Sequence, residues 1–374
     1  MKIGIYTQPL RTNYGGILQA WALQMVLRRM GHEVVTFDPC PYLYLSWKRL
    51  PFSYTKRFFN KWFGSKIPIR YEKLKNVEYN IKSQHLRSFI EANIYRKEFR
   101  KVSELQQFGY DILIAGSDQV WRPRYNITYG RTIEYAFFDF AQTWNVKRIA
   151  YAASFGTDEW EFSTEQTARC SQLAKRFSAI SVREKSGVKL CKEHLGVEAK
   201  QVLDPTMLLN REDYEELIEK GIKSQAPSGE MLCYILDESS ETDALIENVA
   251  GSKGFKPFCA NFIKKNAKVE DQVQPSIEQW LRNFQEAKFV VTDSFHACVF
   301  SIIFGKPFVV ITNVKRGVTR YESLLSMFNL SNHLIRSASE YQPNFDYAVT
   351  PEARKCLDVM KETSLQFLKN SLTH

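Results

Sequence analysis

A histidine beside the end of an expected strand is the residue best suited to chemistry in this sequence. Residues 288–312, KFVVTDSFHACVFSIIFGKPFVVIT, have the pattern of a strand, a turn, an apolar helix and a second strand. His296 falls at the start of that helix, near the carboxyl end of the first strand, where open α/β sheets bind ligands. Asp293 and Ser294 precede it and are expected to cap the helix. The alternative is that His296 is an ordinary polar residue at a helix start.

Two turns that contain glycine follow other expected strands. Asn13, Gly15 and Gly16 precede the first helix, and Ser117 and Asp118 follow the strand pattern YDILIAG. Backbone N–H groups at such a helix start attract anions, so both turns are candidate substrate-binding positions. A plain flexible turn at the first position and a simple helix cap at the second are the alternatives.

Three arginines lie just after expected strands. Arg183 follows the strand AISV, and Arg316 and Arg320 follow the strand PFVVIT. Planar guanidinium groups at strand ends can hold carboxylates or phosphates. Surface ion pairs or contact with water would explain these arginines equally well. No metal site is expected, because no metal-ligand spacing occurs among the histidines.

The elements that must position these residues alternate between strand and helix in two blocks. Strand patterns of the first block occupy residues 2–6, 32–38, 110–116, 148–156, 178–184 and 201–205. Those of the second block occupy residues 231–237, 288–294 and 307–312, with helix patterns over 241–250, 275–287 and 296–305. Strands that alternate with helices indicate a parallel sheet covered on both faces.

The two blocks predict an α/β fold of two Rossmann-like domains that face each other across a cleft. The first domain is expected over residues 1–204, with an insertion at about 41–100, and the second over 205–345. A last helix within 346–374 is expected to cross back onto the first domain.

Composition excludes several classes of protein. Of the 374 residues, 44% are hydrophobic and 25% are charged, which excludes general disorder, collagen-like repeats and a coiled coil. No apolar run approaches the ~20 residues of a membrane span, and the first residues show no export signal. The seven cysteines are scattered without a C-x-x-C spacing. A soluble, cytoplasmic protein without a zinc module is therefore expected.

The positive charge is concentrated in one segment. The net charge is +10, and residues 41–75 contain nine Lys or Arg against one Glu, which leaves about +2 for the remainder. A nucleic-acid binder would spread its charge along a groove, so no nucleic acid is expected as a partner. Ten aromatic residues alternate with these cations: Tyr42, Tyr44, Trp47, Phe52, Tyr54, Phe58, Phe59, Trp62, Phe63 and Tyr71. We expect peripheral contact with the inner face of a membrane; the alternative is that the aromatics fill the core.

Six motifs, in order, resemble the polysaccharide pyruvyl transferase family: NYGGILQAWAL, IAGSDQVW, YAASFGT, ISVREKSG, VLDPTMLL and TDSFHACVFSIIFGKPFVV. The resemblance spans roughly Tyr14 to Leu325 and implies a fold like that of B-type glycosyltransferases. The family transfers the enolpyruvyl part of phosphoenolpyruvate to a sugar, usually as a pyruvate ketal. One departure is Ala297, where the family often has glycine after the histidine.

The resemblance also implies roles for the candidate residues. It implies that His296 is the general acid/base, and that Arg183 and one of Arg316 or Arg320 hold phosphoenolpyruvate. Asp118 and Asp293 would contact acceptor hydroxyls or orient the histidine. No cofactor is needed, and the acceptor is a saccharide of a bacterial surface polysaccharide or its lipid-linked precursor.

Two alternatives to pyruvyl transfer remain open. One is a nucleotide-sugar glycosyltransferase of the same fold. The other is a non-catalytic relative that binds a glycan or an anion.

Overall fold

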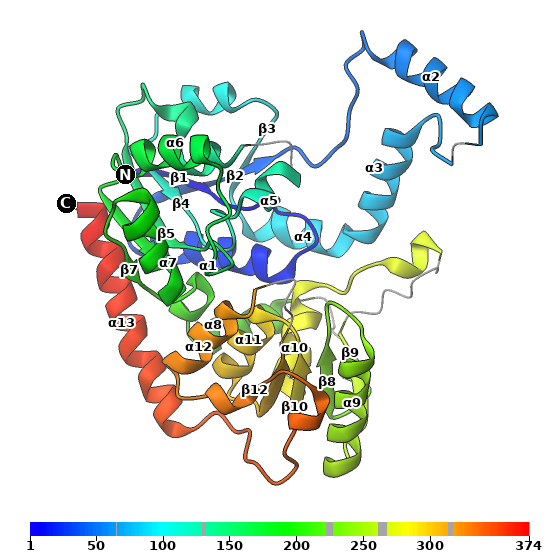
Figure 1. Ribbon diagram of the computed structural model, residues 1–374, viewed down its shortest axis with the longest axis vertical. Coiled ribbons are helices and arrows are strands. Elements are labelled where there is room, and N and C mark those ends of the chain that lie inside the picture. The colour runs from blue at the N-terminus through cyan, green and yellow to red at the C-terminus, as the bar shows by residue number, and fades with distance from the viewer. Residues whose placement is uncertain (65, 129–131, 222–226, 261–267, 313–316, 374) are drawn as a thin grey trace.

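Two parallel sheets with helices on their faces make up this protein (Figure 1). The structure is a computed structural model that describes residues 1–64, 66–128, 132–221, 227–260, 268–312 and 317–373. Arg316 therefore lies outside the described residues. The predicted α/β class with two Rossmann-like units is confirmed by the two sheets.

The first sheet has seven described strands in the order β3-β2-β1-β4-β5-β6-β7, with all neighbours parallel. The strands are β1 (Lys2–Tyr6), β2 (Glu33–Pro39), β3 (Arg96–Phe99), β4 (Ile112–Ala115), β5 (Lys147–Ala153), β6 (Ala179–Val182) and β7 (Lys200–Gln201). The direction of winding reverses between β1 and β4. The loops that follow these two strands diverge at the sheet's carboxyl edge and leave a crevice there.

The second sheet repeats this arrangement with five described strands in the order β12-β11-β10-β8-β9. They are β8 (Met231–Tyr234), β9 (Pro257–Cys259), β10 (Phe289–Thr292), β11 (Phe308–Ile311) and β12 (Leu334–Ile335). Its winding reverses between β8 and β10, so the second crevice lies where these two strands end.

Helices cover both sheets. In the first part of the chain they are α1 (Tyr14–Arg29), α2 (Leu50–Trp62), α3 (Tyr71–Lys82), α4 (Gln84–Asn93), α5 (Pro123–Thr128), α6 (Thr164–Ala174) and α7 (Lys185–Leu190). In the second part they are α8 (Arg211–Lys220), α9 (Ser240–Lys253), α10 (Ile277–Glu286), α11 (Phe295–Phe304), α12 (Thr319–Met327) and α13 (Pro351–Thr373). No described helix is both long enough and apolar enough to cross a bilayer.

One hydrophobic core continues from the first sheet into the second. Ile17 of α1, Trp280 of α10 and Phe300 of α11 belong to the same cluster of buried side chains. The rings of Tyr14 and Trp280 stack with their centroids 5.3 Å apart, and the Tyr14 hydroxyl donates a hydrogen bond to Pro275 O at 2.8 Å. This apolar contact holds the two sheets in one orientation.

Helix α13 runs from the second sheet back along the first (Figure 1). Lys147 Nζ at the start of β5 donates to the carbonyl oxygens of Ser371 and Leu372, each at 3.2 Å. The backbone N–H of Leu203 donates to Ser364 Oγ at 3.0 Å. The second half of α13 thus contacts the first domain.

The strand expected at 201–205 is shorter than its sequence pattern suggests. Strand β7 ends at Gln201, and a short 3₁₀ helix, η5 (Pro205–Leu208), follows. Asp204 causes this break, because its Oδ1 accepts hydrogen bonds from the N–H and the hydroxyl of Thr206 at 3.0 and 2.7 Å. Pro205 has no N–H to donate to a neighbouring strand.

Candidate active site

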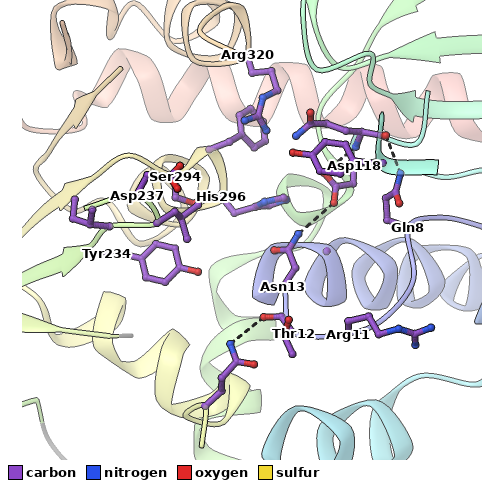
Figure 2. Close-up of a pocket in the computed structure, with 18 of the residues that line it drawn as sticks. Gln8, Arg11, Thr12, Asn13, Asp118, Tyr234, Asp237, Ser294, His296 and Arg320 are labelled. Carbon is purple, nitrogen blue, oxygen red and sulfur yellow. Dashed lines mark hydrogen bonds between the residues drawn. The ribbon is translucent and has the colours of Figure 1, made fainter. Parts of the chain in front are cut away.

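A cleft of about 660 Å³ lies where the two crevices face each other (Figure 2). The loops that follow β1, β4, β8 and β10 line it, which are the strands beside both reversals of winding. Seven of the residues expected at the site line this cleft: Asn13, Gly15, Gly16, Asp118, Ser294, His296 and Arg320.

His296 is the second residue of α11 and is only 7% exposed. In Figure 2 its ring points from the second domain toward Asn13 and Asp118 of the first. Its Nε2 lies 3.9 Å from Asp204 Oδ2, too far for a hydrogen bond, and has no hydrogen-bond partner among the described residues. His296 thus lines the cleft, while its buried Nε2 faces the Asp204 carboxylate without a hydrogen bond to it.

Gly15 allows the ring to take this position. A Cβ atom at residue 15 would lie 2.0 Å from His296 Nδ1, closer than any real side chain can approach. The glycine in α1 and the histidine in α11 are thus in direct contact across the two domains. This contact explains why a helix start contains glycine although glycine is a poor helix former.

Burial lowers the pKa of His296 below its ordinary value of 6.5. Asp204 and Asp118 act against this shift because their negative charges favour the protonated ring. Arg183 and Arg320 add to the lowering because their positive charges repel the added proton. The imidazole is therefore neutral at neutral pH. When it takes up a proton, the carboxylates of Asp204 and Asp118 stabilise the positive charge.

Arg183 lies beneath the cleft and not at its surface. Its side chain is 2% exposed and forms ion pairs with Glu184 and Asp204, each at 2.8 Å. Asp118 Oδ1 lies 3.7 Å from Nη2, and the guanidinium stacks 4.2 Å from the centroid of the Phe295 ring. Three carboxylates surround Arg183, and it is not among the described residues that line this cleft.

Asp204 connects the buried groups below His296. Besides Arg183, its Oδ2 accepts a hydrogen bond from Ser117 Oγ at 3.0 Å. Both Asp204 and Ser117 are buried, so Ser117 supports this carboxylate and does not line the cleft. Burial by itself would raise the pKa of Asp204, but a protonated His296, the Arg183 guanidinium and the hydrogen bonds from Thr206 each lower it, and the net pKa lies below its ordinary value. While His296 is neutral, Arg183 and Thr206 are the groups that favour the charged carboxylate.

Two helices begin at the cleft without a side-chain cap. Asn13 precedes α1 and Ser294 precedes α11, and neither side chain forms a capping hydrogen bond. The expectation that Ser294 caps α11 is therefore wrong. The Asp293 carboxylate instead accepts the N–H groups of Leu236 and Asp237 at 2.6 and 3.0 Å and so shapes the loop after β8. Uncapped N–H groups at a helix start have the charge and geometry that suit an anion.

Two cationic side chains line the described part of the cleft. Arg320 of α12 is 5% exposed, and its guanidinium lies 5.6 Å from the centroid of the Phe295 ring. Arg11, which the sequence analysis did not single out, donates to Pro39 O at 2.5 Å and lies 3.5 Å from Asp38 Oδ1. Of the two arginines expected after β11, Arg320 lines the cleft, and Arg316 lies outside the described residues.

Asp118 forms the opposite wall of the cleft. It has a left-handed backbone with φ of 65°, and its Oδ1 accepts the N–H of Gln119 at 2.9 Å. Asn13 Nδ2 donates to its Oδ2 at 3.5 Å (Figure 2). The left-handed turn brings the carboxylate over the ends of β1 and β4, where it faces His296.

The sequence pattern of one protein family, described as polysaccharide pyruvyl transferase, matches residues 13–315 of the chain. The chain belongs to the polysaccharide pyruvyl transferase family. The match includes every lining residue named above except Arg11 and Arg320. The protein is therefore a transferase of polysaccharide biosynthesis.

Solved structures similar to this pyruvyl transferase family member have low sequence identity. They include UGT89C1 of Arabidopsis thaliana with UDP-L-rhamnose, at 8% identity and a TM-score of 0.49, covering 98% of this chain and 94% of that chain. Another is a UDP-GlcNAc 2-epimerase from Neisseria meningitidis, at 11% identity and a TM-score of 0.47, covering 99% and 94%. No curated protein sequence matches the chain.

Besides Arg11, sequence reasoning missed Asp204 and Glu184, which lie beneath this pyruvyl transferase site. Both lie within the last two residues of the strand patterns expected at 178–184 and 201–205. An acidic residue at the end of an expected strand could therefore have identified both as candidate site residues. Ala297, the departure from the family pattern, is fully buried in the core and does not line the cleft.

Proposed function

We propose that this protein transfers the pyruvate group of phosphoenolpyruvate to a saccharide and forms a pyruvate ketal. The observation that carries the proposal is the position of His296: a neutral imidazole beside an uncapped helix start, facing a second uncapped helix start. This arrangement combines an anion-binding position with a proton-transfer group in one cleft. Family membership supports the same reaction.

The donor binds as an anion between the two helix starts. Phosphoenolpyruvate has a phosphate and a carboxylate, and each is a good acceptor for backbone N–H groups and for a guanidinium. The N–H groups of α1 and α11 and the side chain of Arg320 supply these donors from three separate elements. Donors that are already in place stabilise the charge of the departing phosphate without reorganisation.

His296 moves the proton that this reaction requires. An acceptor hydroxyl adds through its oxygen to C2 of the donor, and its proton passes by way of the imidazole to C3, which becomes a methyl group. The phosphate then leaves with the electrons of its C–O bond. A second sugar hydroxyl adds to C2 and loses its proton to the phosphate or to solvent, which closes the ketal. Proton transfer of this kind typically contributes ~10²–10⁴-fold to the rate.

Asp204 and Arg183 act through the histidine and not on the substrate. The carboxylate of Asp204 stabilises the imidazolium that exists between the two proton transfers, and Arg183 keeps this carboxylate charged and in place. Asp118, on the facing wall, is positioned to accept hydrogen bonds from acceptor hydroxyls. We assign the acceptor to a surface polysaccharide or its lipid-linked precursor, made in the cytoplasm.

The test is phosphate release on incubation with phosphoenolpyruvate and a panel of free and lipid-linked glycans. Mass spectrometry of the glycan should show one added ketal per phosphate released. His296→Asn should lower turnover by at least ~10²-fold. His85→Asn, a change of the same kind at an exposed histidine, is the matched control and should behave as wild type.

Parallel incubations with nucleotide-sugar donors complete the experiment. Transfer from a nucleotide sugar, with no use of phosphoenolpyruvate, would replace the proposal with glycosyl transfer. More than a third of wild-type turnover in His296→Asn would remove the histidine from the mechanism.

A further inference from the structure

Helix α2 extends away from both sheets (Figure 1, blue, upper right). It belongs to residues 42–64 and 66–82, here called the arm, which also contain α3 and connect β2 to α4. None of the residues of α2 or α3 is buried. Because α2 buries no side chain, packing in a core does not account for its aromatic residues.

The arm exposes large aromatic side chains. Trp47, Trp62 and Phe63 are 79%, 82% and 89% exposed, and Tyr44, Phe52, Phe58 and Phe59 are also exposed. The alternative that these aromatics fill the core of the first domain is therefore wrong. Exposed apolar groups gathered on one element indicate an interaction surface.

The exposed groups occupy one face of α2. Phe52 and Phe59 are seven residues apart and Phe58 and Trp62 four apart, which places all four on one side of a helix. Arg57 and Lys61, also four apart, lie on the opposite side. An apolar aromatic face with cations on the other side is typical of helices that lie in a membrane interface.

The arm has a defined structure that keeps this face outward. Arg57 donates to both oxygens of Glu72 in α3 at 2.7 and 2.6 Å, on the side of α2 away from the exposed aromatics. Asn76 pairs with the backbone of Leu43: the Leu43 N–H donates to Oδ1 at 2.9 Å, and Nδ2 donates to Leu43 O at 2.8 Å. The contact of Arg57 uses the polar face of α2, and the contact of Asn76 holds α3 to the segment before α2, while the aromatic face of α2 stays exposed.

Charge identifies the partner as anionic. Residues 41–75 have a net charge of +8, whereas the remainder of the chain has about +2. A second copy of the chain would bring two such segments together or offer them a surface that is itself slightly positive, and like charges disfavour both arrangements. A nucleic acid would bind the cations but leave the aromatic face of α2 in water. An anionic bilayer satisfies both features at once.

We propose that the arm docks the protein on an anionic lipid bilayer, with the aromatic face of α2 in the interface and the cations at the headgroups. The contacts of the arm carry this inference, which does not depend on the reaction in the cleft.

The end of the arm is also connected to the lining of the cleft. Lys82 O, at the end of α3, accepts the N–H of Gln274, whose side chain lines the cleft and donates to Thr12 O at 3.1 Å. The base of the arm thus adjoins the cleft.

The test is flotation of the full-length protein with vesicles of phosphatidylcholine containing phosphatidylglycerol, beside vesicles of phosphatidylcholine alone. Wild type should float with the anionic vesicles at low salt and much less with neutral ones. Raising the salt to 1 M shortens the Debye length from about 10 Å at 0.1 M to about 3 Å and should release most of the protein. Fluorescence of the exposed Trp47 and Trp62 should shift to shorter wavelength on binding.

Two variants separate the contributions. Lys56→Gln/Lys61→Gln should weaken partitioning by about 25-fold, because each cation near an anionic surface contributes roughly fivefold. Phe58→Ser/Trp62→Ser should weaken it at least ~10-fold. Lys192→Gln/Lys220→Gln removes the same charge from exposed positions outside the arm and should bind as wild type. All of these side chains are exposed, so the thermal unfolding midpoint should not change.

Binding by wild type together with loss in both arm variants supports docking. Failure of wild type to float, or equal flotation of wild type and both arm variants, overturns it. An arm-dependent dimer in sedimentation without vesicles, or binding to an oligonucleotide but not to vesicles, also overturns it. None of these readouts requires turnover, so failure here leaves the proposed reaction unaffected.

Discussion

His296 lies among groups that shift its pKa in opposite directions. Because burial lowers the pKa below 6.5, the neutral form that accepts a proton persists on mild acidification. We therefore expect kcat/KM to be flat near neutral pH and to fall only below pH 6.5, as the free imidazole becomes protonated. A pH–rate profile of kcat/KM measures this directly. A midpoint of the kcat/KM profile above pH 7 would mean that the nearby carboxylates raise the pKa of His296 by more than burial lowers it.

Gly15 can be tested through its contact with the histidine ring. Gly15→Ala places a methyl group where His296 Nδ1 now lies, so the ring must move. A displacement of about 1 Å can cost ~10²-fold in rate, and we expect kcat to fall by that order.

Gly16→Ala is the matched control for this change. A Cβ at residue 16 would lie 3.1 Å from Asn13 Nδ2, at the end of a side chain that can shift. Both alanines should favour helix α1 by about 0.5–1 kcal/mol. Equal activity of the two variants would show that the contact between residue 15 and the ring has no role in turnover.

Arg183 is expected to act on turnover and not on donor binding. A lysine keeps the charge but cannot bridge Glu184 and Asp204 together, so Arg183→Lys should cost about 1.5–3 kcal/mol of stability. It should also lower kcat and displace the pH–rate profile, with little change in the KM for phosphoenolpyruvate.

Arg148→Lys provides the comparison for Arg183→Lys. Arg148 is also buried, at 7% exposure, but donates to the carbonyl oxygens of Ala141 and Val146 at the far end of β5. This variant should lose stability without a change in the pH–rate profile. A raised KM for the donor in Arg183→Lys, with unchanged kcat, would show direct contact with phosphoenolpyruvate.

At the scale of elements, a substitution at the uncapped start of α11 can separate an effect on ligand binding from an effect on helix stability. Ser294→Asp introduces a carboxylate that can cap the helix and should stabilise it by about 0.5–2 kcal/mol. The same carboxylate competes for the N–H groups and repels an anion. We expect the KM for phosphoenolpyruvate to rise at least tenfold while thermal stability holds or increases.

The cap of α6 offers the control for Ser294→Asp. Ser163 already accepts the N–H of Gln166 at 3.2 Å, outside the cleft, so Ser163→Asp should leave the KM unchanged. An unaltered KM in both variants would show that the donor does not use the start of α11.

At the scale of the whole molecule, the shared core predicts that both sheets unfold together. Trp280 is fully buried and stacks on Tyr14 of the other domain, so Trp280→Ala should cost about 3–5 kcal/mol. Because the core is continuous, urea unfolding followed by circular dichroism and by tryptophan fluorescence should give one coincident transition.

A second tryptophan tests the cooperativity of this unfolding. Trp121 is also fully buried, but in a cluster confined to the first domain, where it stacks on Phe137 at 4.7 Å. Trp121→Ala should lower the same single transition by a similar amount. Two separate transitions in either variant would mean that the domains fold independently.

The sequence by itself determined the elements and the place of the main candidate residue. Hydrophobic periodicity and turn residues are local signals, and they located the strands β1, β4, β8, β10 and β11 to within a few residues. His296 at a helix start after a buried strand was readable for the same reason. Strands β3, β9 and β12 were missed because they are short and lack a distinctive pattern.

Only the tertiary structure decided which side chains meet. The approach of Asp204 and Gly15 to His296, and the ion pairs that draw Arg183 below the cleft, join segments that are distant in the chain. Contacts of this kind depend on the order of strands in a parallel sheet and on the docking of one domain against the other. The same holds for the arm, whose aromatics could equally have been core residues until the structure placed them in solvent. Local periodicity reports which face of an element is apolar, but what covers that face is set by the fold.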